Sequence, residues 1–223
     1  MNPLPLLSLL ETRILGVLVE KERTVPDTYP LSLNALTAGC NQKNNRQPLM
    51  DAREAEVQAA LDALRAHSLV IESSGARVAR WSHNTGRALR VPPQSVAILA
   101  ALFLRGPQTA AELRTATERL HRFADTSSVE GFLEELARRP EAEGGPLVVL
   151  LPRAAGAREP RWAHLLGGPV EVPAAAPSDP AAPVADIALS ELEALRANQA
   201  RLAAELAELR ALVGRMATEL GIS

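Results

Sequence analysis

Two stretches of this chain share the same order of sequence features, and this duplication restricts the folds that the chain can adopt. The apolar stripe of a predicted helix, spaced i, i+3, i+4, i+7, recurs 72 residues further along. The two stripes are Val57, Ala60, Leu61 and Leu64, and Val129, Phe132, Leu133 and Leu136. Each is followed by an apolar run, a turn-rich stretch and a similar tetrad, Arg80-Trp81-Ser82-His83 or Arg161-Trp162-Ala163-His164. Because these features share one order, we infer a tandem repeat.

Helix-start signals complete each repeat. Capping spacing, in which a short polar residue precedes Glu by three positions, occurs at Ser8/Glu11, Asp51/Glu54, Thr109/Glu112 and Ser127/Glu130, and Ser32 can cap a short helix. Three helices followed by a two-stranded hairpin is the order of a winged helix. We therefore expect a mainly α fold with small β wings (α+β), with winged-helix domains at 1–91 and 92–166. An unrelated α+β domain with the same element order is the alternative.

The C-terminal part of the chain predicts a linker and a coiled coil. Five prolines among alanines in residues 167–185 favour a semi-stiff linker, which we place at 167–186. A heptad pattern then runs through 187–223 and predicts a parallel homodimer. Its dimerisation positions are Leu192, Leu195, Leu202, Leu206, Leu209, Val213, Met216 and Leu220. The alternative is that this stripe packs back on the chain's own domains.

Composition indicates the cellular compartment of the protein and the class of partner that it can bind. Cys40 is the only cysteine, so no intramolecular disulfide can form. We find neither a signal peptide nor an 18-residue apolar span, and we expect a cytoplasmic protein without a membrane partner. Residues 1–166 carry 20 Lys and Arg against 18 Asp and Glu, a balance too neutral for a strongly basic nucleic-acid binder.

Catalytic and metal-binding patterns are missing from the sequence. Cys40 follows an apolar helix with no base nearby, so we interpret it as a structural thiol. The histidines are scattered without metal-ligand spacing, and there is no phosphate loop, dinucleotide fingerprint or GxSxG elbow. We therefore expect a non-enzymatic protein with no cofactor and no metal.

Two polar segments of the first repeat are candidates for nucleic-acid contact. Residues 41–47 are all polar, include two basic side chains and contain no acid, and residues 73–90 also lack acids. Amide and guanidinium groups can contact base edges or phosphates. The candidate nucleic-acid-binding residues are Lys43, Asn44, Asn45, Arg46, Arg77 and Arg80. A structural interpretation, in which the amides of 41–47 satisfy backbone groups of a long connection, is equally open.

The predicted third helix argues against insertion into a DNA groove. Its first turns carry Asp51, Glu54 and Glu56, where a recognition helix presents residues to bases. Two functions therefore remain: a DNA-binding or regulatory protein acting as a dimer, and a protein-interaction scaffold that does not touch nucleic acid. Fold precedent favours the first, and the charge distribution favours the second.

Residues 24–50, TVPDTYPLSLNALTAGCNQKNNRQPLM, resemble the signature of the YceH family of bacterial proteins. The specific pieces are YPLSLNAL and CNQK-NRQP, and the resemblance runs through both repeats and into the C-terminal segment. It implies tandem winged-helix domains. It implies no activity and supplies no catalytic residues.

Overall fold

The computed structural model describes residues 6–73, 78–154, 156–168 and 170. The chain divides into two compact units, residues 1–175 and 176–223, and every described residue belongs to the first. The predicted coil at 187–223, with its dimerisation positions, lies outside the described residues, as does most of the predicted linker.

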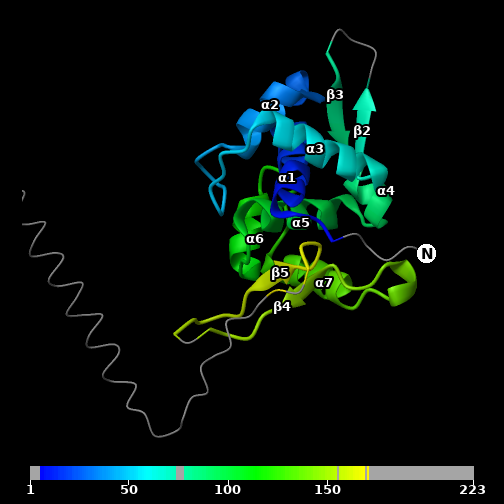
Figure 1. The fold of residues 1–223 in the computed structure, drawn as a ribbon. Coiled ribbons are helices and arrows are strands. Elements are labelled where there is room, and N and C mark those ends of the chain that lie inside the picture. Colours follow the sequence, from blue (N-terminus) through cyan, green and yellow to red (C-terminus); the bar gives the residue numbers. More distant parts are fainter. Residues whose placement is uncertain (1–5, 74–77, 155, 169, 171–223) are drawn as a thin grey trace, which may run out of the picture. The chain divides into compact units, whose positions relative to one another are not determined.

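The first unit is a mixed α+β fold, as expected, in which three helices and a hairpin occur twice in the same order (Figure 1). The first set is α1 (Leu9–Thr24), α2 (Leu33–Cys40), α3 (Glu54–Ala66), β2 (Val70–Ser73) and β3 (Arg80–His83). The second is α5 (Pro93–Arg105), α6 (Ala110–Thr117), α7 (Thr126–Ala137), β4 (Val148–Leu150) and β5 (Trp162–His164). The shorter elements are η1 (Pro26–Thr28), β1 (Leu31–Ser32), α4 (Thr85–Leu89) and η2 (Glu141–Glu143). The sequence did not predict α4, which links the two sets.

The two hairpins share one register. Both are antiparallel, and in each the histidine of the repeated tetrad lies opposite a valine: Val70 pairs with His83, and Val148 with His164. Each hairpin also pairs with a third segment of the chain. In the first repeat β1 pairs with β3, and in the second Gln108 forms a single β-bridge with Trp162. The similar tetrads seen in the sequence therefore occupy equivalent places.

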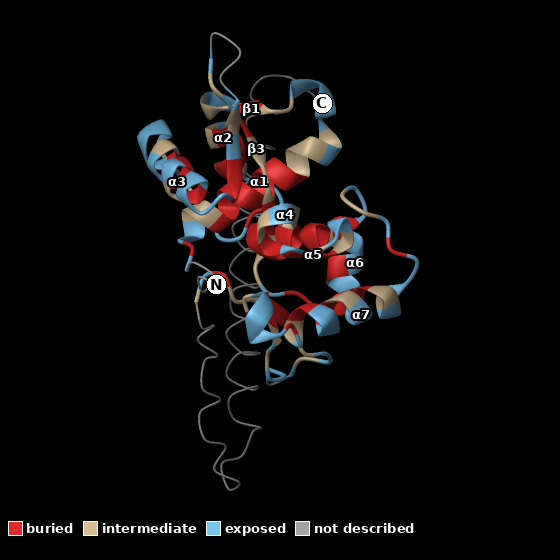
Figure 2. Cartoon of the chain, turned by 90° about the vertical axis from the view of Figure 1, so that its right-hand side faces the viewer, coloured by how far each residue is buried: buried red, intermediate tan, exposed pale blue. Residues whose placement is uncertain are grey.

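Helices α1 and α5 pack against each other and join the two sets. Helix α5 is buried over most of its length and α1 over its central half, and Figure 2 shows these parts in red beside the exposed outer faces of α3 and α7. Gly16 allows the close approach, because a Cβ there would stand 2.8 Å from Leu104 Cγ and 3.2 Å from Phe103 Cβ. A helix that is apolar on all sides, such as α5, requires burial of this kind.

Three predicted helix starts are confirmed. The side chains of Ser8, Ser32 and Thr109 each accept a hydrogen bond from the backbone N–H three residues on, at 3.2, 3.3 and 3.2 Å. These hydrogen bonds satisfy backbone donors that have no partner within the helix.

Two predicted starts are wrong. Helix α7 begins after Asp125, not Ser127, because the Asp125 carboxylate accepts the Ser128 N–H at 2.7 Å. Helix α3 begins after Arg53, not Asp51. The chain is not yet helical at Ala52, whose backbone N–H and C=O both bond the side chain of Asn41.

The tryptophans of the two tetrads lie in the core. Trp81 is 1% exposed and Trp162 is 9% exposed, so both are buried. Among the described residues, no helix combines the length and the apolar character needed to cross a lipid bilayer.

Candidate functional site

Arg46 lies inside the protein rather than on a nucleic-acid surface. Its side chain is fully buried, and Nη1 and Nη2 donate to the two carboxylate oxygens of Glu20 at 3.1 and 2.6 Å. Its Nε donates to the carbonyl of Gly39 at 3.1 Å, and Nη1 also reaches the carbonyl of Asn45. Because none of its guanidinium faces solvent, we assign Arg46 to the fold and not to DNA contact.

The rest of the polar connection is held by hydrogen bonds from Arg13 on α1 and from its own Asn41. Arg13, fully buried on α1, donates to the carbonyls of Cys40 at 3.2 Å and Pro48 at 2.7 Å. Asn41 fixes Ala52 by two hydrogen bonds of 2.8 Å. The structural interpretation of this segment therefore accounts for most of its polar groups.

Three of the candidate residues remain exposed at the tip of this connection. Lys43, Asn44 and Asn45 are exposed, and Asn45 adopts a left-handed backbone conformation with φ of 58°. Asparagine tolerates this conformation better than most residues, which gives Asn45 a conformational role as well.

Arg80 has a structural partner that recurs in the second repeat. Its Nη1 donates to the carbonyl of Pro30 at 2.9 Å, and Arg161 Nη1 donates to the carbonyl of Pro107 at 2.8 Å. The equivalence indicates that both arginines tie the second hairpin strand to the segment preceding α2 or α6. Arg77, also predicted to contact DNA, lies outside the described residues.

The exposed face of α3 is acidic. Glu54, Glu56 and Asp62 are exposed, and the nearby cations are already paired. Arg53 lies 3.1 Å from Glu56, and Arg65 pairs with Asp62 at 3.5 Å and with Glu72. The side-chain hydrogen bond from Arg53 lowers the pKa of Glu56, because it favours the charged form of the carboxylate.

The third helix of the second repeat has the same character. On α7 the exposed acids are Glu130, Glu134 and Glu135, and Arg138 pairs with Glu134 at 2.9 Å. Both third helices therefore present carboxylates, which phosphates would repel.

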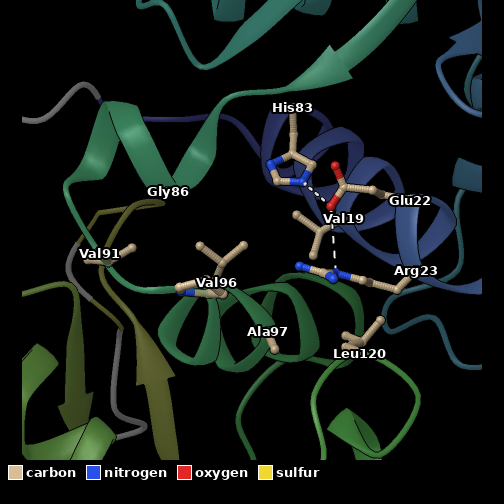
Figure 3. Close-up of a pocket in the computed structure, with 10 residues that line it drawn as sticks. Val19, Glu22, Arg23, His83, Gly86, Val91, Val96, Ala97 and Leu120 are labelled. Atoms are coloured by element: carbon tan, nitrogen blue, oxygen red, sulfur yellow. Dashed lines mark hydrogen bonds and ion pairs between the residues drawn. The ribbon is translucent and has the colours of Figure 1, made fainter.

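A pocket of about 270 Å³ lies at the seam between the two repeats (Figure 3). Its apolar wall comes from α1 and α5, through Val19, Val96 and Ala97. Polar groups gather on one side, where the ring of His83 and the guanidinium of Arg23 converge on Glu22 from two directions.

The polar side of this pocket is a charge-paired group without a nucleophile. His83 Nε2 lies 3.1 Å from Glu22 Oε2, and Arg23 Nε lies 3.6 Å from the same oxygen.

Cys40 lies in the core, where burial raises the pKa of its thiol to about 12, as a structural thiol requires. No group of three potential metal ligands occurs in the part of the chain that the structure describes.

Sequence reasoning missed the groups that the tertiary structure assembles. Glu22 and Arg13 looked like ordinary charged helix residues, and neither was singled out. One signal was available for Arg13, since it directly precedes the apolar run of residues 14–19 in the sequence. A charged residue in such a position needs buried partners.

The described residues define a class of α+β protein in which two three-helix-and-hairpin repeats are joined through α1 and α5. The chain belongs to the family described as "Protein of unknown function, DUF480", which matches residues 7–157. It is 62% identical over 219 residues to a UPF0502 protein of Methylibium petroleiphilum, covering 98% of this chain and 92% of the relative. A UPF0502 protein of Burkholderia vietnamiensis is 61% identical over 213 residues, covering 96% and 89%. The expectation of an uncharacterised bacterial family is thereby confirmed.

Proposed function

We propose that this chain is a non-enzymatic protein of two tandem winged-helix domains that forms a dimer through its C-terminal segment and docks a protein partner with a basic surface. The order of elements and the shared hairpin register support the winged-helix assignment. The resemblance to the YceH family implies the same architecture.

The observation that carries the protein-docking function is the acidic outer face of both third helices. A helix entering a DNA groove must tolerate phosphates on both sides, and carboxylates at these positions would weaken binding. A basic protein surface would instead be attracted, and complementary charge speeds association and selects the partner. Two such faces on one chain, doubled by dimerisation, would provide several docking points.

Site-specific photo-crosslinking in bacterial cells tests this proposal. A photoreactive amino acid replaces Ala59, which lies on α3, and the matched control carries it at exposed Ala111 on α6. We expect a discrete protein adduct from Ala59 that is absent from Ala111 and is lost when Glu54, Glu56 and Asp62 are changed to Gln or Asn. Equal adducts from both positions, or adducts that ignore the charge changes, would contradict docking through α3.

DNA binding is the second candidate function, favoured by the exposed Lys43-Asn44-Asn45 tip. Fluorescence anisotropy with a mixed-sequence duplex at several salt concentrations measures it. Lys43→Ala and Arg80→Ala should each flatten the slope of log affinity against log salt by about 0.9, because each would leave one phosphate without its cation. The acidic α3 serves as an internal control, because Glu54→Gln should leave DNA binding unchanged or strengthen it. Affinity weaker than about 10⁻⁴ M, or binding that ignores the two cations, would exclude this function.

Dimerisation has its own test. Deleting residues 187–223 should convert the dimer into a folded monomer, because the heptad positions that would form the interface all lie in that segment. Light scattering gives the mass, and circular dichroism reports whether the truncated chain is folded. A truncated chain that remains dimeric would move the interface to the repeats.

A further inference from the structure

Two adjoining cavities meet at helix α6, and most of the charged residues that line them are cations. The larger cavity, of about 400 Å³, lies between α6 and the C-terminal ends of α1 and α5. The smaller, of about 100 Å³, lies at the end of α6 and shares Thr115 and Glu118 with the larger. Lys21 lines the larger cavity, and four arginines line one or the other. We call these four the arginine surface: Arg105, Arg114, Arg119 and Arg122.

The guanidinium groups of the arginine surface are unpaired. None of the four forms a hydrogen bond or an ion pair within the part of the chain that the structure describes. Three of them are exposed, and Arg105 is half-buried. Asp125, the acid that the charge of Arg114 reaches, is itself held by two hydrogen bonds from Ser128 of 2.7 Å. The arginine surface therefore presents donors and positive charge that the described residues leave available to a partner.

The acids near the arginine surface offset little of its charge. Glu20 lines the larger cavity, but its carboxylate accepts hydrogen bonds from buried Arg46 at 2.6 and 3.1 Å. Glu112, on α6, is paired with Arg161 at 2.8 Å. Glu118 lines both cavities and is exposed. The exposed acids of α3 and α7 described above line neither cavity, so this surface is positive although residues 1–166 as a whole are nearly neutral.

The unpaired charge of the arginine surface favours a polyanionic partner. Salt screens charges more than about 10 Å away at 0.1 M, so the local group of arginines, rather than the net charge of the chain, sets the potential that a partner meets. From their charge, exposure and lack of partners, we infer that the arginine surface binds the phosphate backbone of a nucleic-acid duplex. Guanidinium groups hold phosphates by charge-assisted hydrogen bonds, and such contacts position a duplex without reading its sequence.

The lining of the two cavities favours a duplex over a single strand or a small anion. Proteins that bind single strands stack the bases on aromatic side chains. The aromatic residue that lines these cavities, Phe123, is only 5% exposed and packs edge-on against Phe132. The four arginines are also distributed over both cavities, which suits successive phosphates better than one small anion. The inferred site is separate from the protein-docking faces of α3 and α7, and from the Lys43 tip.

Fluorescence anisotropy of the full chain at several salt concentrations tests the inference, with a mixed-sequence DNA duplex and with the RNA duplex of the same sequence. Changing Arg119 and Arg122 together to Gln removes two exposed cations. For DNA, this double variant should flatten the slope of log affinity against log salt by about 1.8 and weaken binding at least about tenfold at 0.1 M salt. Glu118→Gln should tighten binding about twofold to threefold, because it removes a repulsive charge.

The matched control is Arg87→Gln, which removes the same charge from an exposed arginine of α4 that lines neither cavity. Its affinity and salt slope should equal those of the unchanged chain. Tight binding of either duplex that depends on Arg119 and Arg122 would support the inference and show which nucleic acid is preferred. Circular dichroism reports whether each variant is folded, and if the double variant is not, unchanged affinity in Glu118→Gln would refute the site.

Two further results would overturn the inference. One is the absence of binding tighter than about 10⁻⁴ M to both duplexes, or a loss in Arg87→Gln equal to that in the double variant. The other is DNA binding that depends on Lys43 and Arg80 but not on the arginine surface. That second result would leave DNA binding itself in place and move its contacts to the first repeat.

Discussion

Glu20→Gln should destabilise the protein far more than the loss of an ordinary surface charge. The change leaves the fully buried guanidinium of Arg46 without its counter-charge, while the Glu20 side chain itself is only 18% exposed. Removing one partner of a buried ion pair costs about 3–5 kcal/mol of unfolding free energy. A glutamine can still accept one hydrogen bond, and the partial exposure of Glu20 weakens the pair, so we expect about 2–4 kcal/mol.

The matched control is Glu134→Gln. Its partner Arg138 is 77% exposed, and an exposed i, i+4 pair contributes only about 0.3–0.5 kcal/mol. Urea denaturation followed by far-UV circular dichroism measures both variants, and the Glu20 variant should also melt roughly 4–16 °C lower. If Glu20→Gln lies within about 0.5 kcal/mol of the control, the buried pair is not a stabilising element. Arg46 would then return to the set of candidate DNA contacts.

Three further tests probe the core. Trp81→Ala and Trp162→Ala should each cost about 3–5 kcal/mol in urea titrations, as truncation of buried aromatics does, and a loss below about 1 kcal/mol would mean an exposed ring. Burial lowers the pKa of His164 to about 4, so the folded protein keeps it neutral while the unfolded chain protonates near pH 6.5. The free energy of unfolding should therefore fall by up to about 3 kcal/mol as the pH drops from 6.5 to 4, and His164→Gln should remove that part of the pH dependence. Gly16→Ala should cost about 1–3 kcal/mol, because the added Cβ would lie 2.8 Å from an α5 side chain, whereas Gly131→Ala, with no atom within 4 Å, should be neutral or stabilising. Equal stabilities for the two glycine variants would contradict tight α1–α5 packing.

Local patterns in the sequence were sufficient to predict three helices and a hairpin, in that order, in each repeat. The capping residues Ser8, Ser32 and Thr109 act over three positions, so their effect can be predicted without knowing the rest of the fold. The similar tetrads around Trp81 and Trp162 likewise predicted hairpins in equivalent places of the two repeats. The start of α3 was predicted wrongly because Asn41, eleven residues away, holds Ala52 in the preceding loop.

The tertiary structure alone decided which charged side chains face solvent. In the sequence, Arg46 and Lys43 are both cations of one polar segment, and no local pattern separates them. The difference arises because the fold brings Glu20, 26 residues earlier in the chain, against Arg46 and leaves Lys43 exposed. Burial of a charge is stable only with its partner in place. The position of such a partner depends on how distant helices pack, so these assignments could come only from the folded structure.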